Sequence, residues 1–229
     1  KKLYIITVSI FTLTVPYILL IVSPHLKEDY YLDNFHFLLD FVSDSYRDLL
    51  SAREKCFCKR FKDLNIDARR LFVRLTNRKG PYFRNDKIKY SIIADISETI
   101  DELIRSDLAQ MAIPDLNDAV SLCSKSELIT LPEFLDWPVS SNKADLVARL
   151  AELKILNPTE ELGISVIKLL GQEELKIFKL LFFGNFHQNM TEFVMHEIVA
   201  PFESYALSPM TMSFSTRNSL ETMIELKQF

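Results

Sequence analysis

Helical periodicity dominates the pattern of hydrophobic and polar positions in this chain. Residues 33–50 place apolar side chains at helical spacing, and Asp33 or Asn34 is available as the helix cap. Ser51 precedes Glu54 by three positions, a capping-box pattern that predicts another helix directly after it. The pattern therefore predicts short helices joined by tight turns, as in a helix-turn-helix module.

The next segment adds a third helix, a wing and a closing helix. Asn65 and Asp67 mark a turn and a new cap before a helix over 69–78. After a Gly-Pro break, residues 83–93 alternate enough to predict a short strand or wing. Residues 97–108 return to helical spacing, with Ser97 as cap. A basic helix, a wing and a closing helix are the parts of a winged-helix-like fold.

Two further regions follow. Residues 115–135 predict one or two helices and residues 143–153 another, with Trp137 in the loop between them packing against both. From residue 157 onward the pattern predicts more helices, including one over 173–183. We therefore expect a mainly helical protein whose last part is the start of a helical linker region.

An apolar run opens the chain. Residues 3–22 contain no charged side chain, and Lys1 and Lys2 precede them. The run is long enough to span a bilayer, and its basic flank fits a signal anchor. Three interpretations stay open: a membrane anchor, a buried strand or helix, and an upstream extension from a misplaced start of translation.

Positive charge is concentrated in one stretch. Residues 53–89 hold 13 Lys and Arg against 4 Asp and Glu, a net charge of +9, although the whole chain carries −4. In the predicted helix over 69–78, an apolar stripe lies beside a row of cations, so one face can enter a core while the other meets a polyanion. Such a face and wing can bind phosphates with little sequence preference. The candidate DNA contacts in this stretch are Arg70, Arg74, Arg78, Lys79, Arg84, Lys87 and Lys89.

Two other interpretations of this stretch stay open. The cations form a solvated surface balanced by the acidic remainder of the chain, or they bind an acidic protein or an anionic membrane. Tyr82 and Phe83 lie between the cations, and they either pack in the core or stack on exposed bases.

The sequence offers no convincing catalytic set. It lacks Gly-rich phosphate-binding motifs, GxSxG and HExxH, and no carboxylates have the spacing of a metal-dependent nuclease. Cys56 and Cys58 would point to different faces of a helix, which makes a poor metal pair. With three cysteines and no repeat, we expect a reducing compartment. Four residues that are close in sequence are interpreted as surface and cap residues, namely His187, Glu192, His196 and Glu197.

Three segments of the chain resemble one known family. Residues 30–42 (YYLDNFHFLLDFV), 71–90 (LFVRLTNRKGPYFRNDKIKY) and 181–194 (LFFGNFHQNMTEFV) are similar, in this order, to the N-terminal half of the Fanconi-associated nuclease family. Members of that family carry a C-terminal VRR-NUC nuclease domain. Residues 122–150 resemble the family's SAP-type DNA-binding module, and Lys143 matches the lysine of its G-x-K-A-x-L-V pattern.

The resemblance implies binding of branched or 5′-flapped DNA in interstrand crosslink repair, with metal-dependent cleavage of phosphodiester bonds. It carries Arg74, Arg78, Lys79 and Lys143 over as DNA contacts. The carboxylates that hold Mg²⁺ or Mn²⁺ belong to the C-terminal nuclease domain and have no counterparts here. This chain alone is therefore expected to bind DNA without cutting it, to need no cofactor, and to work in the nucleus or at a cytoplasmic nucleoid.

The sequence thus predicts four regions. They are an apolar N-terminal run over 1–24, a basic winged-helix-like module over 25–113, a SAP-like helical module over 114–156, and the start of a helical linker over 157–229, cut short before the nuclease domain.

Overall fold

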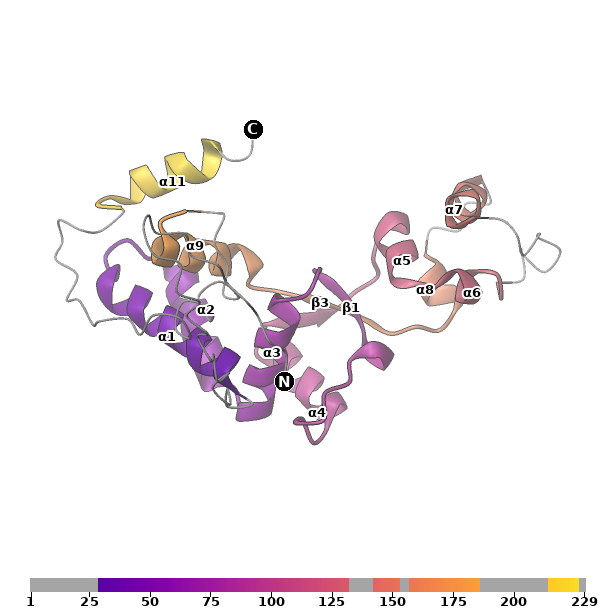
Figure 1. Cartoon of the computed structure of the whole chain (residues 1–229), viewed down its shortest axis with the longest axis horizontal. Helices are drawn as coiled ribbons and strands as arrows, with labels where there is room; N and C mark the ends of the chain where they lie inside the picture. The colour runs from indigo at the N-terminus through magenta and orange to yellow at the C-terminus, as the bar shows by residue number, and fades with distance from the viewer. Residues whose placement is uncertain (1–28, 132–141, 153–156, 186–213, 227–229) are drawn as a thin grey trace, which may run out of the picture.

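The protein forms two helical lobes with a small sheet between them (Figure 1). The computed structural model describes residues 29–131, 142–152, 157–185 and 214–226. The helices of the large lobe are α1 (Tyr30–Ser45), α2 (Ala52–Asp63), α3 (Ile66–Thr76), α4 (Ile96–Arg105), α9 (Gln172–Phe183) and α11 (Arg217–Leu226). Those of the small lobe are α5 (Leu116–Leu122), α6 (Lys125–Leu128), α7 (Lys143–Glu152) and α8 (Pro158–Glu161). The prediction of a mainly helical, winged-helix-like protein is confirmed.

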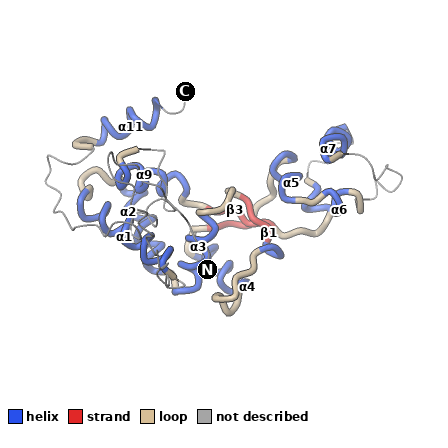
Figure 2. Tube along the Cα trace, viewed as in Figure 1, coloured by secondary structure: helices blue, strands red, loops and turns tan. Residues whose placement is uncertain are grey.

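A sheet of three short antiparallel strands joins the lobes (Figure 2). Its strands, in spatial order, are β1 (Tyr82–Arg84), β3 (Val166–Leu169) and β2 (Ala109–Met111). The central strand is the last in sequence, so the small lobe is an insertion between β2 and β3. The wing predicted over 83–93 is confirmed only in part, because the chain leaves the sheet after Arg84 into a 3-10 turn, η1 (Asn85–Lys87).

Capping residues set the predicted starts of two helices. The Ser51 amide donates to Glu54 Oε2 at 2.7 Å, and the Glu54 amide donates to Ser51 Oγ at 3.4 Å, so the predicted capping box opens α2. Asn65 Oδ1 accepts the Ala68 amide at 2.9 Å at the start of α3. The caps at Ser51 and Asn65 are confirmed, whereas Asp67 lies within the first turn of α3 because the helix begins at Ile66.

Two other predicted caps are wrong. The first helix begins at Tyr30, ahead of Asp33 and Asn34, because the apolar stripe of α1 extends one turn further toward the N-terminus than the prediction placed it. Asn34 is buried within the helix instead of capping it. The cap of α4 is Asp95, not Ser97, since the Asp95 side chain accepts a backbone amide in the first turn.

Aromatic rings form the centre of the large-lobe core. Phe35 and Phe61 lie with ring centroids 4.8 Å apart, and Phe57 contacts both Phe72 and Phe178 with centroids about 6 Å apart. These five rings come from α1, α2, α3 and α9, and each is almost fully buried. Offset and tilted packing of this kind adds about 0.5–1.5 kcal/mol per pair to the burial of apolar area.

This core also corrects the predicted domain boundaries. Ile167 and Leu169 of β3 belong to it, and so does Leu220 of α11. Much of the region predicted as a separate linker over 157–229 therefore completes the first module. The sequence pattern did not reveal this because β3 has only four residues and its partners lie far away in the chain.

The small lobe has its own core, which contains Val120, Cys123, Leu128, Leu131, Leu146 and Leu150. Cys56 is exposed and Cys58 is buried, as expected for neighbours on opposite faces of a helix. Several predicted features lie outside the described residues, namely the apolar run over 3–22, Trp137, His187, Glu192, His196 and Glu197. Within the described part, no helix is long and apolar enough to cross a membrane.

Candidate nucleic-acid interface

Arg74 lies between two tyrosine rings on the outer side of α3. Its guanidinium carbon is 4.5 Å from the ring centroid of Tyr31 on α1 and 4.9 Å from that of Tyr90. Its Nε donates to the Tyr31 hydroxyl at 3.0 Å. A planar guanidinium stacks well on aromatic faces, and this hydrogen bond uses only one of its five N–H donors. No described carboxylate accepts from the others, which leaves them available for an anion.

The helical period explains this orientation. Leu71, Phe72 and Leu75 of α3 are fully buried, and Arg74, three residues after Leu71, lies at the edge of this apolar face with its side chain half-buried. Burial raises the pKa of the Tyr31 phenol, although the hydrogen bond from Arg74 opposes that shift. Tyr31 therefore keeps its proton at neutral pH, and its hydroxyl can donate to a further acceptor.

Two more cations continue this surface at the end of α3. The guanidinium of Arg78 lies 5.6 Å from the ring centroid of Phe83, and Lys79 is exposed. A Cβ at Gly80 would come within 2.8 Å of the Phe83 ring, so glycine permits the close approach of this turn to β1. Neither cation has a carboxylate partner in the described part of the chain. We call Tyr31, Arg74, Arg78, Lys79 and Tyr90 the basic-aromatic face.

Arg70 does not join this face as a free cation. It binds Asp29 at 2.5 Å and Asp67 at 2.9 Å, and its side chain is only 20% exposed. The hydrogen bond to Asp29 is the main cause that raises its pKa. These pairs hold the start of α3 against the start of α1, so they give the predicted phosphate contact no support.

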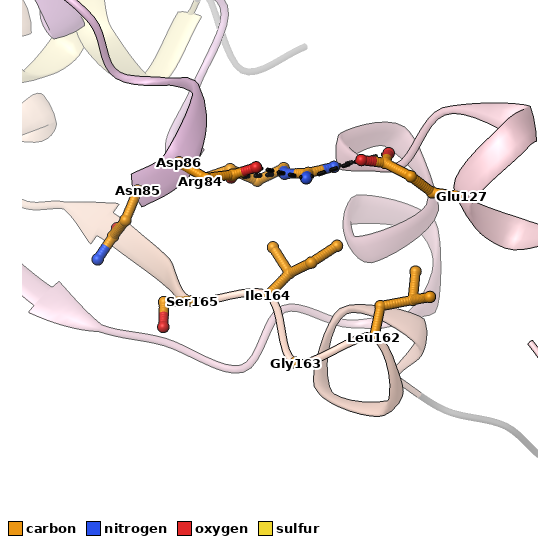
Figure 3. Close-up of a pocket in the computed structure, with 8 residues that line it drawn as sticks. All are labelled: Arg84, Asn85, Asp86, Glu127, Leu162, Gly163, Ile164 and Ser165. Atoms are coloured by element: carbon orange, nitrogen blue, oxygen red, sulfur yellow. Dashed lines mark hydrogen bonds and ion pairs between the residues drawn. The ribbon is translucent and has the colours of Figure 1, made fainter. Parts of the chain in front are cut away.

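Arg84 is buried between the lobes, and its side chain is 5% exposed (Figure 3). Its terminal nitrogens donate to the Glu127 carboxylate at 2.8 Å each, and Nε and a terminal nitrogen bind Asp86 at 2.9 and 2.7 Å. These contacts lower the pKa of Asp86 and lower that of Glu127 to about 2, chiefly through the hydrogen bonds from Arg84. A cavity of about 500 Å³ opens beside them. The structure gives no support to the prediction that Arg84 contacts DNA, because its guanidinium is bound by two carboxylates and buried from solvent.

The other predicted lysines differ in availability. Lys87 is 61% exposed with Nζ 4.0 Å from Glu127, so its charge is partly balanced. Lys89 is exposed, and no described carboxylate pairs with it. Lys143 donates to the backbone carbonyl of Cys123 at 2.7 Å, a bond within the small lobe. Of these three, Lys89 is the freest to meet a phosphate.

The structure adds one cation that the sequence prediction missed. Lys168 on β3 is the cross-strand neighbour of Tyr82, and its Nζ lies 5.5 Å from the Tyr82 ring centroid. Phe83, in contrast, is buried in the core. Residue 168 fell in the region predicted as a linker, and only the short, mostly apolar run Val166–Leu169 signalled a strand there.

The fold and this surface define a winged-helix-like helix-turn-helix protein with a basic face. No group of three or more His, Cys, Asp or Glu side chains is placed to hold a metal ion among the described residues. The site thus consists of cations and aromatic rings on a helical scaffold.

Comparison with known proteins shows what this chain is similar to. Residues 29–110 match the family profile described as "FAN1, HTH domain". The Fanconi-associated nuclease 1 homolog of Pseudomonas aeruginosa is 29% identical over 215 residues, which cover 89% of this chain and 38% of that protein. The homolog of Arabidopsis thaliana is 28% identical over 218 residues, covering 85% and 24%. The profile match covers a helix-turn-helix domain of the Fanconi-associated nuclease type, and the chain spans well under half the length of these two relatives.

Solved structures show the same similarity. The structure of paFAN1 bound to 2-nucleotide 5′-flap DNA with a gap superimposes with a TM-score of 0.77 at 28% identity, covering 87% of this chain and 38% of that one. A second paFAN1 structure, bound to 1-nucleotide 5′-flap DNA with a gap, also gives 0.77, at 26% identity. The likeness therefore extends well beyond residues 29–110.

Proposed function

We propose that this chain binds branched DNA of the gapped 5′-flap class, as the recognition part of a structure-specific nuclease in interstrand crosslink repair. The observation that carries the proposal is Arg74, which is stacked between Tyr31 and Tyr90 with most of its donors unused. The similarity to structures of paFAN1 bound to gapped flap DNA supports the choice of substrate class.

In this proposal the basic-aromatic face holds the sugar-phosphate backbone. The rings of Tyr31 and Tyr90 fix the plane of the Arg74 guanidinium, so little side-chain entropy is lost when it binds a phosphate. Arg78 and Lys79 reach neighbouring phosphates from the end of the same helix. Contacts of this type position the duplex and release counterions, and they carry little sequence information.

Cleavage belongs, in the same proposal, to a nuclease domain of the VRR-NUC type that holds Mg²⁺ or Mn²⁺. The described residues bind and orient the DNA for that domain. Such a role places the protein where DNA is, in the nucleus or at the nucleoid.

The test is fluorescence anisotropy with a gapped 5′-flap duplex and a plain duplex over a salt series. The variant replaces Arg74, Arg78 and Lys79 with Ala. Each lost phosphate contact makes the negative slope of log K against log salt less steep by about 0.9. The slope of the triple variant should therefore be less steep than that of the wild type by about 2.7. Between about 50 and 200 mM salt, wild-type affinity should then fall about 40-fold more than that of the variant.

A second triple variant controls for net charge. It replaces Arg53, Arg105 and Lys176, which are exposed and each paired with a carboxylate, so it removes the same charge from elsewhere on the surface. Its salt slope should stay close to that of the wild type. An unchanged slope in the first variant would remove these residues from the interface. A wild-type protein that binds no DNA at low salt would overturn the proposed function in favour of an acidic protein partner.

A further inference from the structure

The register of the sheet creates a row of side chains that the sequence separates widely. Tyr82 on β1 and Gln110 on β2 are both direct cross-strand neighbours of Lys168 on β3. Residues opposite each other in a ladder point to the same face, so these three side chains form one row across the sheet. In the next row Phe83 and Ile167 point to the opposite face and enter the large-lobe core, whereas Met111 at the end of that row is exposed.

The row is accessible. Gln110 is exposed, and Tyr82 and Lys168 are half-buried. No described carboxylate pairs with Lys168, whose ammonium instead lies over the Tyr82 ring. On the same face, Arg84 is neutralised by Asp86 and Glu127. Lys168 is therefore an unbalanced positive charge on this side of the sheet.

The row is also close in sequence to the basic-aromatic face. Tyr82 follows Lys79 by three residues, and the intervening turn packs against Phe83 through Gly80. Arg78 of that face lies against Phe83, which points to the other side of the sheet, so the row and the basic-aromatic face lie on either side of β1. The row presents an aromatic ring, an ammonium group and an amide side by side.

We propose that Tyr82, Lys168 and Gln110 form a subsite for an unpaired nucleotide of a gap or flap. This inference rests on the proposed function. The Tyr82 ring stacks on the base, the Lys168 ammonium moves from the ring to the adjoining phosphate, and the Gln110 amide donates to and accepts from the base edge. Such sets of aromatic and cationic side chains bind single-stranded nucleic acid with little sequence preference, because every base has a π-face.

Photo-cross-linking tests the position directly. A gapped 5′-flap duplex carrying 5-iodo-2′-deoxyuridine at the unpaired position is bound to the full chain, irradiated and analysed by peptide mapping. We expect the cross-link at Tyr82, and a yield that falls at least about fivefold in Tyr82→Leu. Cross-links confined to other peptides would overturn the subsite.

Affinity measurements separate the subsite from the duplex interface. Tyr82→Leu should weaken binding of the gapped flap at least about fivefold, in line with the loss of one stacked base, and change plain-duplex affinity less than about twofold. Tyr82→Phe should retain the gapped-flap affinity because it keeps the ring. Lys168→Gln should lower the salt slope for the gapped flap by about 0.7, while Lys176→Gln, a charge-matched control paired with Glu173, should not.

The outcomes distinguish the two proposals. Equal losses of affinity for both DNAs in Tyr82→Leu, or no loss for either, would overturn the subsite while leaving the proposed function intact. A wild-type chain that binds neither DNA would overturn the proposed function itself. Circular dichroism and thermal unfolding of each variant verify that the sheet still forms.

Discussion

Replacing Gly171 with alanine tests whether β3 and α9 belong to the large-lobe core. Gly171 precedes α9 with a φ of +79°, and a Cβ there would lie 2.6 Å from the Phe57 ring. Phe57 is 1% exposed and belongs to the large-lobe core, where side chains are closely packed. The substitution therefore combines a backbone penalty with a steric one.

The magnitude follows from these two terms. A left-handed conformation costs a residue with a Cβ about 1–2 kcal/mol, and overpacking a core costs about 1–3 kcal/mol. Alanine also reduces the conformational entropy of the unfolded chain, which offsets about 0.4–1 kcal/mol of this destabilisation. We expect Gly171→Ala to lower the free energy of unfolding by about 2–4 kcal/mol, measured by urea denaturation followed by far-UV circular dichroism.

Gly163→Ala is the matched control. Gly163 also has a positive φ, +64°, but no atom lies within 4 Å of a Cβ built there. It should therefore cost about 1 kcal/mol, from the backbone alone. The difference between the two variants isolates the contact with Phe57. Equal losses of stability in the two variants would refute the packing of α9 against α2.

Two further predictions concern buried ion pairs. The pKa of Glu127 falls from 4.5 to about 2 on folding, so its ionised carboxylate stabilises the folded protein by at most about 3 kcal/mol. This contribution is complete above about pH 4.5 and is lost as the pH falls through about 2. The gap in unfolding free energy between wild type and Glu127→Gln should shrink by about 2 kcal/mol from pH 7 to pH 3, and a constant gap would contradict the assignment. Arg217→Met removes the partner that binds the buried Glu54 carboxylate at 2.7 Å, and it should cost about 2 kcal/mol by urea denaturation. Arg105→Met, whose partner Glu98 is exposed, should cost under about 0.5 kcal/mol, and similar losses in both would show that α11 does not dock on α2.

Local features of the sequence determined most of the helices and the position of the basic module. The capping box of Ser51 and Glu54 and the cap at Asn65 depend on residues three positions apart, so the sequence displays them directly. The apolar stripe of α3 and the cations beside it likewise follow from helical spacing. The concentration of positive charge between residues 53 and 89 is also visible without a structure.

Only the tertiary structure decided which cations are available. Arg74 and Arg84 look alike in the sequence, yet Arg74 is half-buried between two tyrosines with no described carboxylate partner, while Arg84 is bound by Glu127, which lies 43 residues away. Lys168 lies opposite Tyr82 because β3, which follows the small lobe in the sequence, is the central strand of the sheet and pairs with β1. Helices and caps depend on neighbours along the chain, whereas burial, ion pairing and strand partners depend on contacts between distant segments, and a single sequence does not display them.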